Sequence, residues 1–329
     1  MKKYIVFASL LAIFLSACST KEVYKPKKIS DDWEKTASMN ERIIDTSDNV
    51  ALLQNRKVLS PNGELNVTIP QNQRVISLSD GRVLSASIDG NITLTSVDDG
   101  VKKFLNLKKT IAAASVQDDI LAVLFANDDI ALYSIATQEL LFKEQGGKVV
   151  ANDARIVNPF FLKDLVIFST LDGKVIIVNS KLKKRLRTVI VSSEDYFNNV
   201  IYFNIADNKI LAATSYKLLA MAQKELRQKY EIRNIVYDGT LMYITTKQGE
   251  VIALTPDLQV DSKIKFPFAH FLGMIDYNAK LYILEKEGYM IVVDKKTFDY
   301  SVHEVDLNDG FVFVGDKVFY VDDEKIFVK

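Results

Sequence analysis

The chain repeats a pair of apolar strands joined by a tight polar turn about every forty residues, seven times over. Clear examples are Val83–Leu94, Leu165–Ile177 and Leu241–Ile252. The seven turns are centred on Gly90, Asp129, Gly173, Tyr216, Gly249, Gly288 and Glu324. A period near forty residues with several short strands per unit is typical of a β-propeller rather than of a helical solenoid. The fold class is therefore predicted to be all-β.

Each unit is long enough for four strands. We expect the first blade at 73–107, because Asp80-Gly81, Asp89-Gly90 and Asp99-Gly100 divide this segment and Asp-Gly is a strong hairpin signal. Later blades are expected at 111–144, 154–191, 200–231, 232–266 and 270–305. A last blade begins near residue 310 and reaches only three strands by Lys329.

An incomplete last blade would leave an open sheet edge, which is an aggregation hazard. We expect Glu64–Ile69 to fill its outer position, with 50–59 as a further strand outside it. The prediction is a seven-bladed propeller of four-stranded antiparallel blades. An eighth blade is possible but would need a unit from the residues before 50, which lack the pattern.

The N-terminus has the pattern of a bacterial secretory signal: Lys2-Lys3, an apolar run to Leu15, and the small residues Ser16 and Ala17. The run is shorter than the about 20 residues that span a bilayer. Cys18 follows and is the only cysteine, so no disulfide can form within the chain. An alternative is a plain secretory signal with an incidental cysteine.

Leu15-Ser16-Ala17-Cys18 resembles the lipobox of bacterial lipoproteins. The resemblance implies that Cys18 becomes the mature N-terminus and carries the lipid. Ser19, in place of an aspartate, implies sorting to the outer membrane, facing the periplasm. The expected organisation is a signal peptide at 1–17, a lipidated N-terminus and flexible tether at 18–49, and a propeller at 50–329 closed by N-terminal strands. Trp33, the only tryptophan, has no assigned role in this tether.

Charge and composition limit the chemistry. The chain has 42 basic and 42 acidic residues, whereas nucleic-acid binding needs a dominant basic surface. His270 and His303 are the only histidines, and neither has a second metal-ligand type at a recognisable spacing. No nucleophile elbow, phosphate-binding glycine loop or Cys-His pair is present in the sequence. We therefore expect a protein that is not an enzyme and that has no metal, cofactor or nucleic-acid partner.

The segments Asp172–Asn179, Gln248–Thr255 and Glu287–Asp294 resemble the repeat of pyrroloquinoline-quinone-type propellers. Together with the lipobox, they make the chain similar to the BamB-like lipoproteins of outer-membrane β-barrel assembly. The resemblance implies a noncatalytic scaffold that docks on the periplasmic domains of the barrel-assembly protein. Two alternatives from other classes stay open: a quinone- or small-ligand-binding propeller, and a binding module for envelope or host proteins. The blades lack the tryptophan with which the family's repeats usually end.

Loop length indicates where a partner would bind. The longest crossovers between blades are expected at 145–153 and 192–199, on one rim, and both lead into aromatic pairs. Exposed aromatic residues commonly anchor protein interfaces. The alternative is that these rings pack between blades. The candidate partner-binding residues are Phe160, Phe161, Asp195, Tyr196, Phe197 and Phe268.

Overall fold

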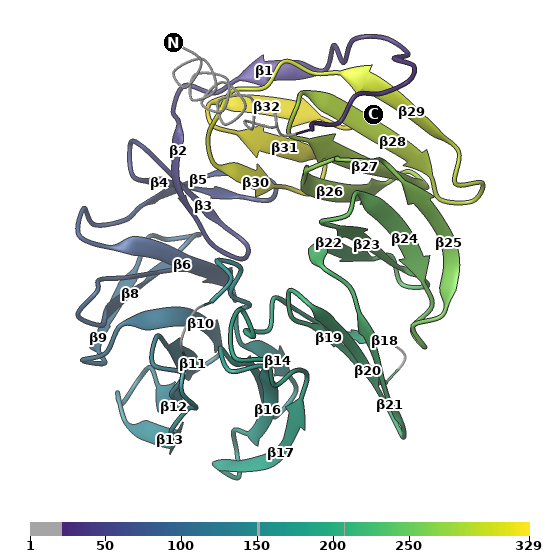
Figure 1. The fold of residues 1–329 in the computed structure, drawn as a ribbon. Helices are drawn as coiled ribbons and strands as arrows, with labels where there is room; N and C mark the ends of the chain where they lie inside the picture. The colour runs from purple at the N-terminus through teal and green to yellow at the C-terminus, as the bar shows by residue number, and fades with distance from the viewer. Residues whose placement is uncertain (1–21, 150–151, 207) are drawn as a thin grey trace, which may run out of the picture.

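The computed structural model describes residues 22–149, 152–206 and 208–329, which form eight four-stranded antiparallel sheets arranged as a ring (Figure 1). The β-propeller prediction is confirmed. The signal sequence and the lipobox with Cys18 lie outside the described residues. Within the described part of the chain, no helix has the length and apolar character to cross a bilayer.

Blades are numbered here from the N-terminus. Blade 1 contains β2 (Ile43–Thr46), β3 (Ala51–Leu53), β4 (Lys57–Ser60) and β5 (Gly63–Thr68). Blade 2 contains β6 (Arg74–Ser79), β7 (Arg82–Ala86), β8 (Asn91–Ser96) and β9 (Lys102–Asn106). Blade 3 contains β10 (Ile111–Gln117), β11 (Ile120–Phe125), β12 (Ile130–Ser134) and β13 (Leu140–Glu144). Blade 4 contains β14 (Phe160–Leu162), β15 (Leu165–Ser169), β16 (Lys174–Asn179) and β17 (Lys184–Ile190).

The second half of the ring follows the same plan. Blade 5 contains β18 (Tyr202–Ala206), β19 (Lys209–Ala213), β20 (Lys217–Met221) and β21 (Glu225–Lys229). Blade 6 contains β22 (Ile232–Tyr237), β23 (Met242–Thr246), β24 (Glu250–Leu254) and β25 (Val260–Lys265). Blade 7 contains β26 (Phe271–Tyr277), β27 (Lys280–Glu285), β28 (Tyr289–Asp294) and β29 (Tyr300–Glu304). Blade 8 contains β30 (Val312–Val314), β31 (Val318–Val321), β32 (Glu324–Phe327) and β1 (Thr36–Ser38).

The predicted count of seven blades is one too low. The additional blade is blade 1, which is formed by the segment before residue 69. Glu64–Ile69 was expected as the outer strand of the last blade and residues 50–59 outside it, but they contribute β3, β4 and β5 of blade 1. Strands β2, β3 and β4 have only three or four residues, and no Asp-Gly turn separates them. The repeat signal is therefore too weak in blade 1 to be recognised.

The ring is closed by an N-terminal strand, but not by the one expected. Strand β1 pairs antiparallel with β32, with Thr36 opposite Ile326 and Ser38 opposite Glu324, and takes the outer position of blade 8. The propeller thus uses chain on both sides of the expected boundary at residue 50. Pairing with β1 covers the edge of β32 and supplies the fourth strand of blade 8.

Both faces of each blade are buried, because alternate residues of a strand point to opposite neighbours. In β27, Leu281 and Ile283 pack with blade 6, whereas Tyr282 and Leu284 pack with blade 8. One apolar cluster of this kind lies between every pair of consecutive blades, including blades 8 and 1. The core is therefore a closed circle of eight interfaces rather than one central core.

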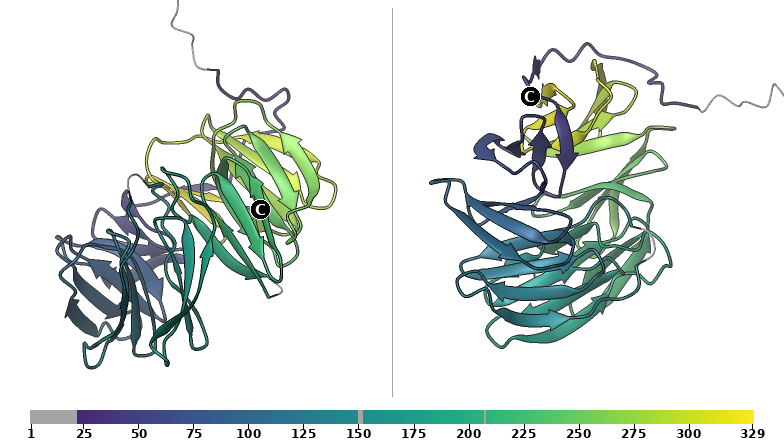
Figure 2. Two further views of the ribbon diagram at one scale, coloured as in Figure 1. Left: turned by 60° about the horizontal axis from the view of Figure 1, so that its bottom comes forward. Right: turned by 90° about the vertical axis from the view of Figure 1, so that its left-hand side faces the viewer.

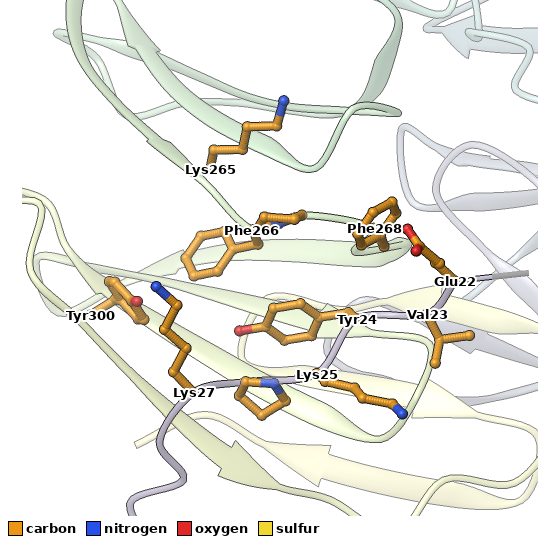
Figure 3. Close-up of a pocket in the computed structure, with 11 residues that line it drawn as sticks. Glu22, Val23, Tyr24, Lys25, Lys27, Lys265, Phe266, Phe268 and Tyr300 are labelled. Carbon is orange, nitrogen blue, oxygen red and sulfur yellow. The ribbon is translucent and has the colours of Figure 1, made fainter.

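The segment 22–35, expected to be part of a flexible tether, is docked on blades 7 and 8 (Figure 2). Tyr24 lies 5 % exposed against Phe266 and Tyr289, with ring centroids 6.0 and 5.6 Å away (Figure 3). The backbone N–H of Trp33 donates to the Glu304 carbonyl of β29 at 2.7 Å. The Trp33 side chain is 5 % exposed within the cluster between blades 7 and 8. The expected tether is thus shorter than 18–49, because its two large aromatic residues are inserted into the fold.

Candidate interaction surface

The two longest crossovers of the described chain lie on either side of blade 4. One joins β13 to β14 and the other joins β17 to β18. Asn199, which is fully buried, connects them: its amide oxygen accepts from the Asp153 N–H at 2.7 Å, and its Nδ2 donates to the Arg155 carbonyl at 2.8 Å. The two crossovers therefore form one continuous surface, which we call the crossover face.

Residues 152–159 run across the middle of the ring instead of following blade 4 alone. Arg155 reaches blade 6, where its guanidinium donates to the carbonyls of Ile232 and Arg233. Three residues later, the side-chain amide of Asn158 donates to the Asp48 carboxylate of blade 1 at 3.2 Å. The chain itself thus crosses the central channel between blade 6 and blade 1.

An ion pair fixes this crossing segment. Arg155 donates from Nε and Nη2 to the two carboxylate oxygens of Asp153 at 2.7 and 2.5 Å, and the Ser215 hydroxyl donates to the same carboxylate at 2.6 Å. Burial alone would raise the pKa of Asp153, but Arg155 and Ser215 outweigh it and hold the pKa well below its usual range. The Asp153 carboxyl group is therefore ionised at neutral pH, and the N–H groups of Arg155 are engaged by Asp153, Ser215 and the carbonyls of blade 6.

Tyr196 and Phe197 project from the β17–β18 crossover, where they are 58 % and 44 % exposed. Phe197 has a φ of 50°, a left-handed conformation that is uncommon for a bulky residue. Together with Glu194 and Asp195 they cover a cavity of about 720 Å³ above blades 5 and 6. Its other walls come from the β19–β20 turn, the β21–β22 crossover and the β23–β24 turn. The arrangement presents aromatic rings at the rim of a hollow, as protein-binding surfaces often do.

Gly173 determines how this crossover sits on blade 4. It has a φ of +87°, and a Cβ built on it would lie 2.6 Å from the Ser192 carbonyl oxygen and 2.4 Å from Asn198 Nδ2. Asn198 Nδ2 in turn donates to the carbonyls of Asp172 and Ser192 at 2.8 and 3.1 Å. Only glycine allows the crossover to approach this closely.

We expect Gly173→Ala to destabilise the protein by about 1–3 kcal/mol and to loosen the crossover that carries Tyr196 and Phe197. Urea unfolding and limited proteolysis at 191–199 measure the two effects. Gly239→Ala is the matched control, because Gly239 also has a positive φ of +96° but open space around its Cβ position. If both variants were cut equally fast at 191–199, the close approach at Gly173 would not control the crossover.

A second cavity, of about 460 Å³, adjoins the first and shares Phe197 and Tyr216 with it. Its charged lining consists of Arg155, Arg233, Lys247 and Asp153, besides His270. The Lys247 ammonium lies 5.0 Å from the centre of the Tyr216 ring. Three cations face one carboxylate here, so the mouth of the channel carries a positive charge although the whole chain is neutral.

The remaining predicted residues lie in different surroundings. Phe268 is 59 % exposed beside the docked N-terminal segment (Figure 3), whereas its neighbour Phe266 is buried between blades 6 and 7. Phe160 is 40 % exposed and lies 5.6 Å from Phe203 of blade 5, and Phe161 packs partly buried between blades 3 and 4. The structure therefore brings together only Asp195, Tyr196 and Phe197. Arg155 and Arg233 lie within the predicted blades 154–191 and 232–266, but they were missed because neither belongs to a functional motif.

The described residues contain no group of three or more histidine, cysteine or acidic side chains placed to hold a metal ion. The most buried carboxyl groups have backbone partners instead. Burial raises the pKa of Glu285, whose oxygens accept from the N–H groups of His270 and Glu287 at 2.9 and 2.7 Å. This carboxyl group fixes the turn before β28 and the start of β26.

No family model matches the chain. It is 30 % identical over 223 residues to the plasminogen-binding protein PgbB of two Helicobacter pylori strains, J99 and 26695. The match covers 65 % of this chain and 41 % of each relative, so the chain spans less than half the length of these curated relatives.

Among solved structures, BamB from Moraxella catarrhalis has a TM-score of 0.68 at 12 % identity, over 88 % of this chain and 97 % of BamB. The computationally designed Ika8 protein has a TM-score of 0.65 at 13 % identity, over 91 % of this chain and 99 % of Ika8. Identities this low carry information on the fold and not on partners. The chain therefore has a BamB-like β-propeller fold.

Proposed function

We propose that the protein is a noncatalytic scaffold of the bacterial cell envelope that binds a protein partner through its crossover face. Lipid on Cys18 would hold it at the outer membrane, facing the periplasm. The observation that carries the proposal is the pair of exposed aromatic residues, Tyr196 and Phe197, at the rim of the 720 Å³ hollow. Aromatic residues at the edge of a concave surface are typical anchors of protein interfaces.

The leading partner in this proposal is the β-barrel assembly protein, through its periplasmic domains. The BamB-like fold and the lipobox support it. A second candidate is a host protein, because the sequence relatives are named for plasminogen binding. Both candidates require the same kind of surface, and they differ in whether the partner comes from the cell's own envelope or from outside it.

The test uses the full-length lipoprotein in mild detergent with two purified partners in parallel: the periplasmic domains of the native β-barrel assembly protein, and plasminogen. The double variant Tyr196→Ala, Phe197→Ala should weaken binding of the true partner at least about tenfold, because interface anchors contribute on the order of 2 kcal/mol each. Phe104→Ala is the matched control, since Phe104 is 61 % exposed on β9 of blade 2, outside the crossover face.

Binding of the assembly protein alone, lost in the double variant and kept in Phe104→Ala, would support the leading proposal. Binding of plasminogen alone with the same pattern would favour the second candidate. If a double variant with an unchanged far-UV spectrum bound as tightly as the unmodified protein, the crossover face would not be the interface.

A further inference from the structure

The cavity at the mouth of the channel contains a cation whose hydrogen-bonding capacity is not used. Arg233 lies in β22, the first strand of blade 6, and its Nε atom is buried with no hydrogen-bond partner among the described residues. Burial, and next the positive charge of Arg155, lower the pKa of Arg233. A buried N–H group without an acceptor is costly unless a ligand or a change of rotamer supplies one.

The nearby carboxylates do not supply that acceptor. Asp153 is held in the two-pronged ion pair with Arg155 and by Ser215. Glu231 accepts a hydrogen bond from the side-chain amide of Gln248. Within the lining of the cavity, Asp153 therefore compensates Arg155, and Arg233 and Lys247 remain as the excess positive charge.

A second buried atom in the same cavity has no hydrogen-bond partner either, and this atom is an acceptor rather than a donor. Asn152 Oδ1 is an acceptor with no donor among residues 22–149, 152–206 and 208–329. A ligand that fits must then offer an acceptor to Arg233 and a donor to Asn152. A simple anion such as phosphate supplies mainly acceptors, whereas a peptide supplies a carboxylate and backbone N–H groups together.

We propose that this cavity binds a glutamate or aspartate side chain of an extended segment in the partner protein, with the carboxylate on Arg233 and a backbone N–H on Asn152. Phe197 and Tyr216 line the same cavity and would contact the apolar residues on either side of the acid. Lys247 adds positive potential and steers the acidic segment to the mouth of the channel. The proposal rests on the proposed function only in assuming a protein partner on the crossover face.

The test is fluorescence anisotropy with the full-length lipoprotein in mild detergent and a fluorescein-labelled pentapeptide, Leu-Ser-Glu-Ser-Leu, against the same peptide with glutamine in the centre. The glutamate peptide should bind at least about tenfold more tightly, because a hydrogen bond to an ionised partner is roughly twice as strong as a neutral one and the cavity is positive. Arg233→Gln should remove that preference. Arg227→Gln, which deletes an equal charge on the outer strand β21, should keep it.

Equal binding of the two peptides to the unmodified protein would overturn the proposal without reference to any variant. So would an Arg233→Gln protein that kept the preference, or displacement of the peptide by inorganic phosphate as effectively as by unlabelled glutamate peptide at constant ionic strength. Arg233→Lys, which keeps the charge but loses the planar donor pair, should bind with intermediate affinity. The proposed function fails separately, through the Tyr196→Ala, Phe197→Ala variant and its purified partners.

Discussion

Replacing Trp33 with alanine should lower the free energy of unfolding by about 3–5 kcal/mol, the range measured for large aromatic residues removed from protein cores. Trp33 lies between blades 7 and 8, with its ring 6.0 Å from Tyr282 and its Nε1 donating to the Phe327 carbonyl at 2.9 Å. The Lys329 ammonium lies 4.4 Å from the centre of the indole ring. The substitution therefore removes apolar burial, a hydrogen bond and a cation–π contact between blades 7 and 8.

Urea unfolding followed by far-UV circular dichroism measures this effect. In the unmodified protein, the fluorescence of the only tryptophan reports directly whether segment 22–35 is docked. Phe104→Ala should change stability by less than about 0.5 kcal/mol, because that ring is mostly exposed. A Trp33→Ala variant with an unchanged unfolding midpoint would contradict the docked position of this segment.

Replacing Asp128 with asparagine should stabilise the protein at neutral and alkaline pH. Asp128 is 1 % exposed, and its carboxyl group accepts from the N–H groups of Leu171 and Gly147 at 2.6 and 3.3 Å. Burial, and next the negative charge of Asp172, raise the pKa of Asp128 to about 7. Two carboxyl groups therefore share one enclosed site between blades 3 and 4.

The sign of the pH dependence follows from linkage. In the unfolded chain Asp128 ionises near its ordinary pKa of about 4, whereas in the folded protein it keeps its proton until about pH 7. The contribution of the Asp128 carboxyl group to the free energy of unfolding is fully present below about pH 4. It is lost as the pH rises from about 4 to about 7. An asparagine keeps the acceptor for Leu171 and offers a donor to Asp172 without any charge to bury.

The measured quantity is the urea midpoint of the Asp128→Asn variant and of the unmodified protein at about pH 4 and about pH 8. The gain in the free energy of unfolding of Asp128→Asn over the unmodified protein should be small at about pH 4 and on the order of 2 kcal/mol at about pH 8. Asp129→Asn is the neighbouring control and should destabilise at neutral pH, since Asp129 forms an ion pair with Lys109 at 2.5 Å. A gain of equal size at both pH values would show that ionisation of Asp128 is not its cause.

The sequence alone determined the architecture of blades 2 to 7 and of the three C-terminal strands of blade 8. Their Asp-Gly and related turns recur at a spacing near forty, and glycines such as Gly90 and Gly288 adopt the positive φ that these turns require. Turn chemistry and strand alternation are local properties, so they can be recognised without knowing which blades become neighbours.

Blade 1 and the closing strand were decided by tertiary contacts. Strand β1 has three exposed residues and no pattern of its own, and it is a strand because β32 offers an unpaired edge. Tyr24 and Trp33 are single aromatic residues in a polar stretch, and only the gaps between blades 6, 7 and 8 give them a place to be buried.

The candidate site depends still more on the fold. The crossover aromatics Tyr196 and Phe197 were recognisable from loop length and residue type, because both are properties of the sequence. Arg155 and Arg233, 78 residues apart, were not, since they meet only where one crossover passes over the channel. Local periodicity thus specified the blades, whereas the charge and shape of the channel mouth arise from side chains that closure of the ring brings together.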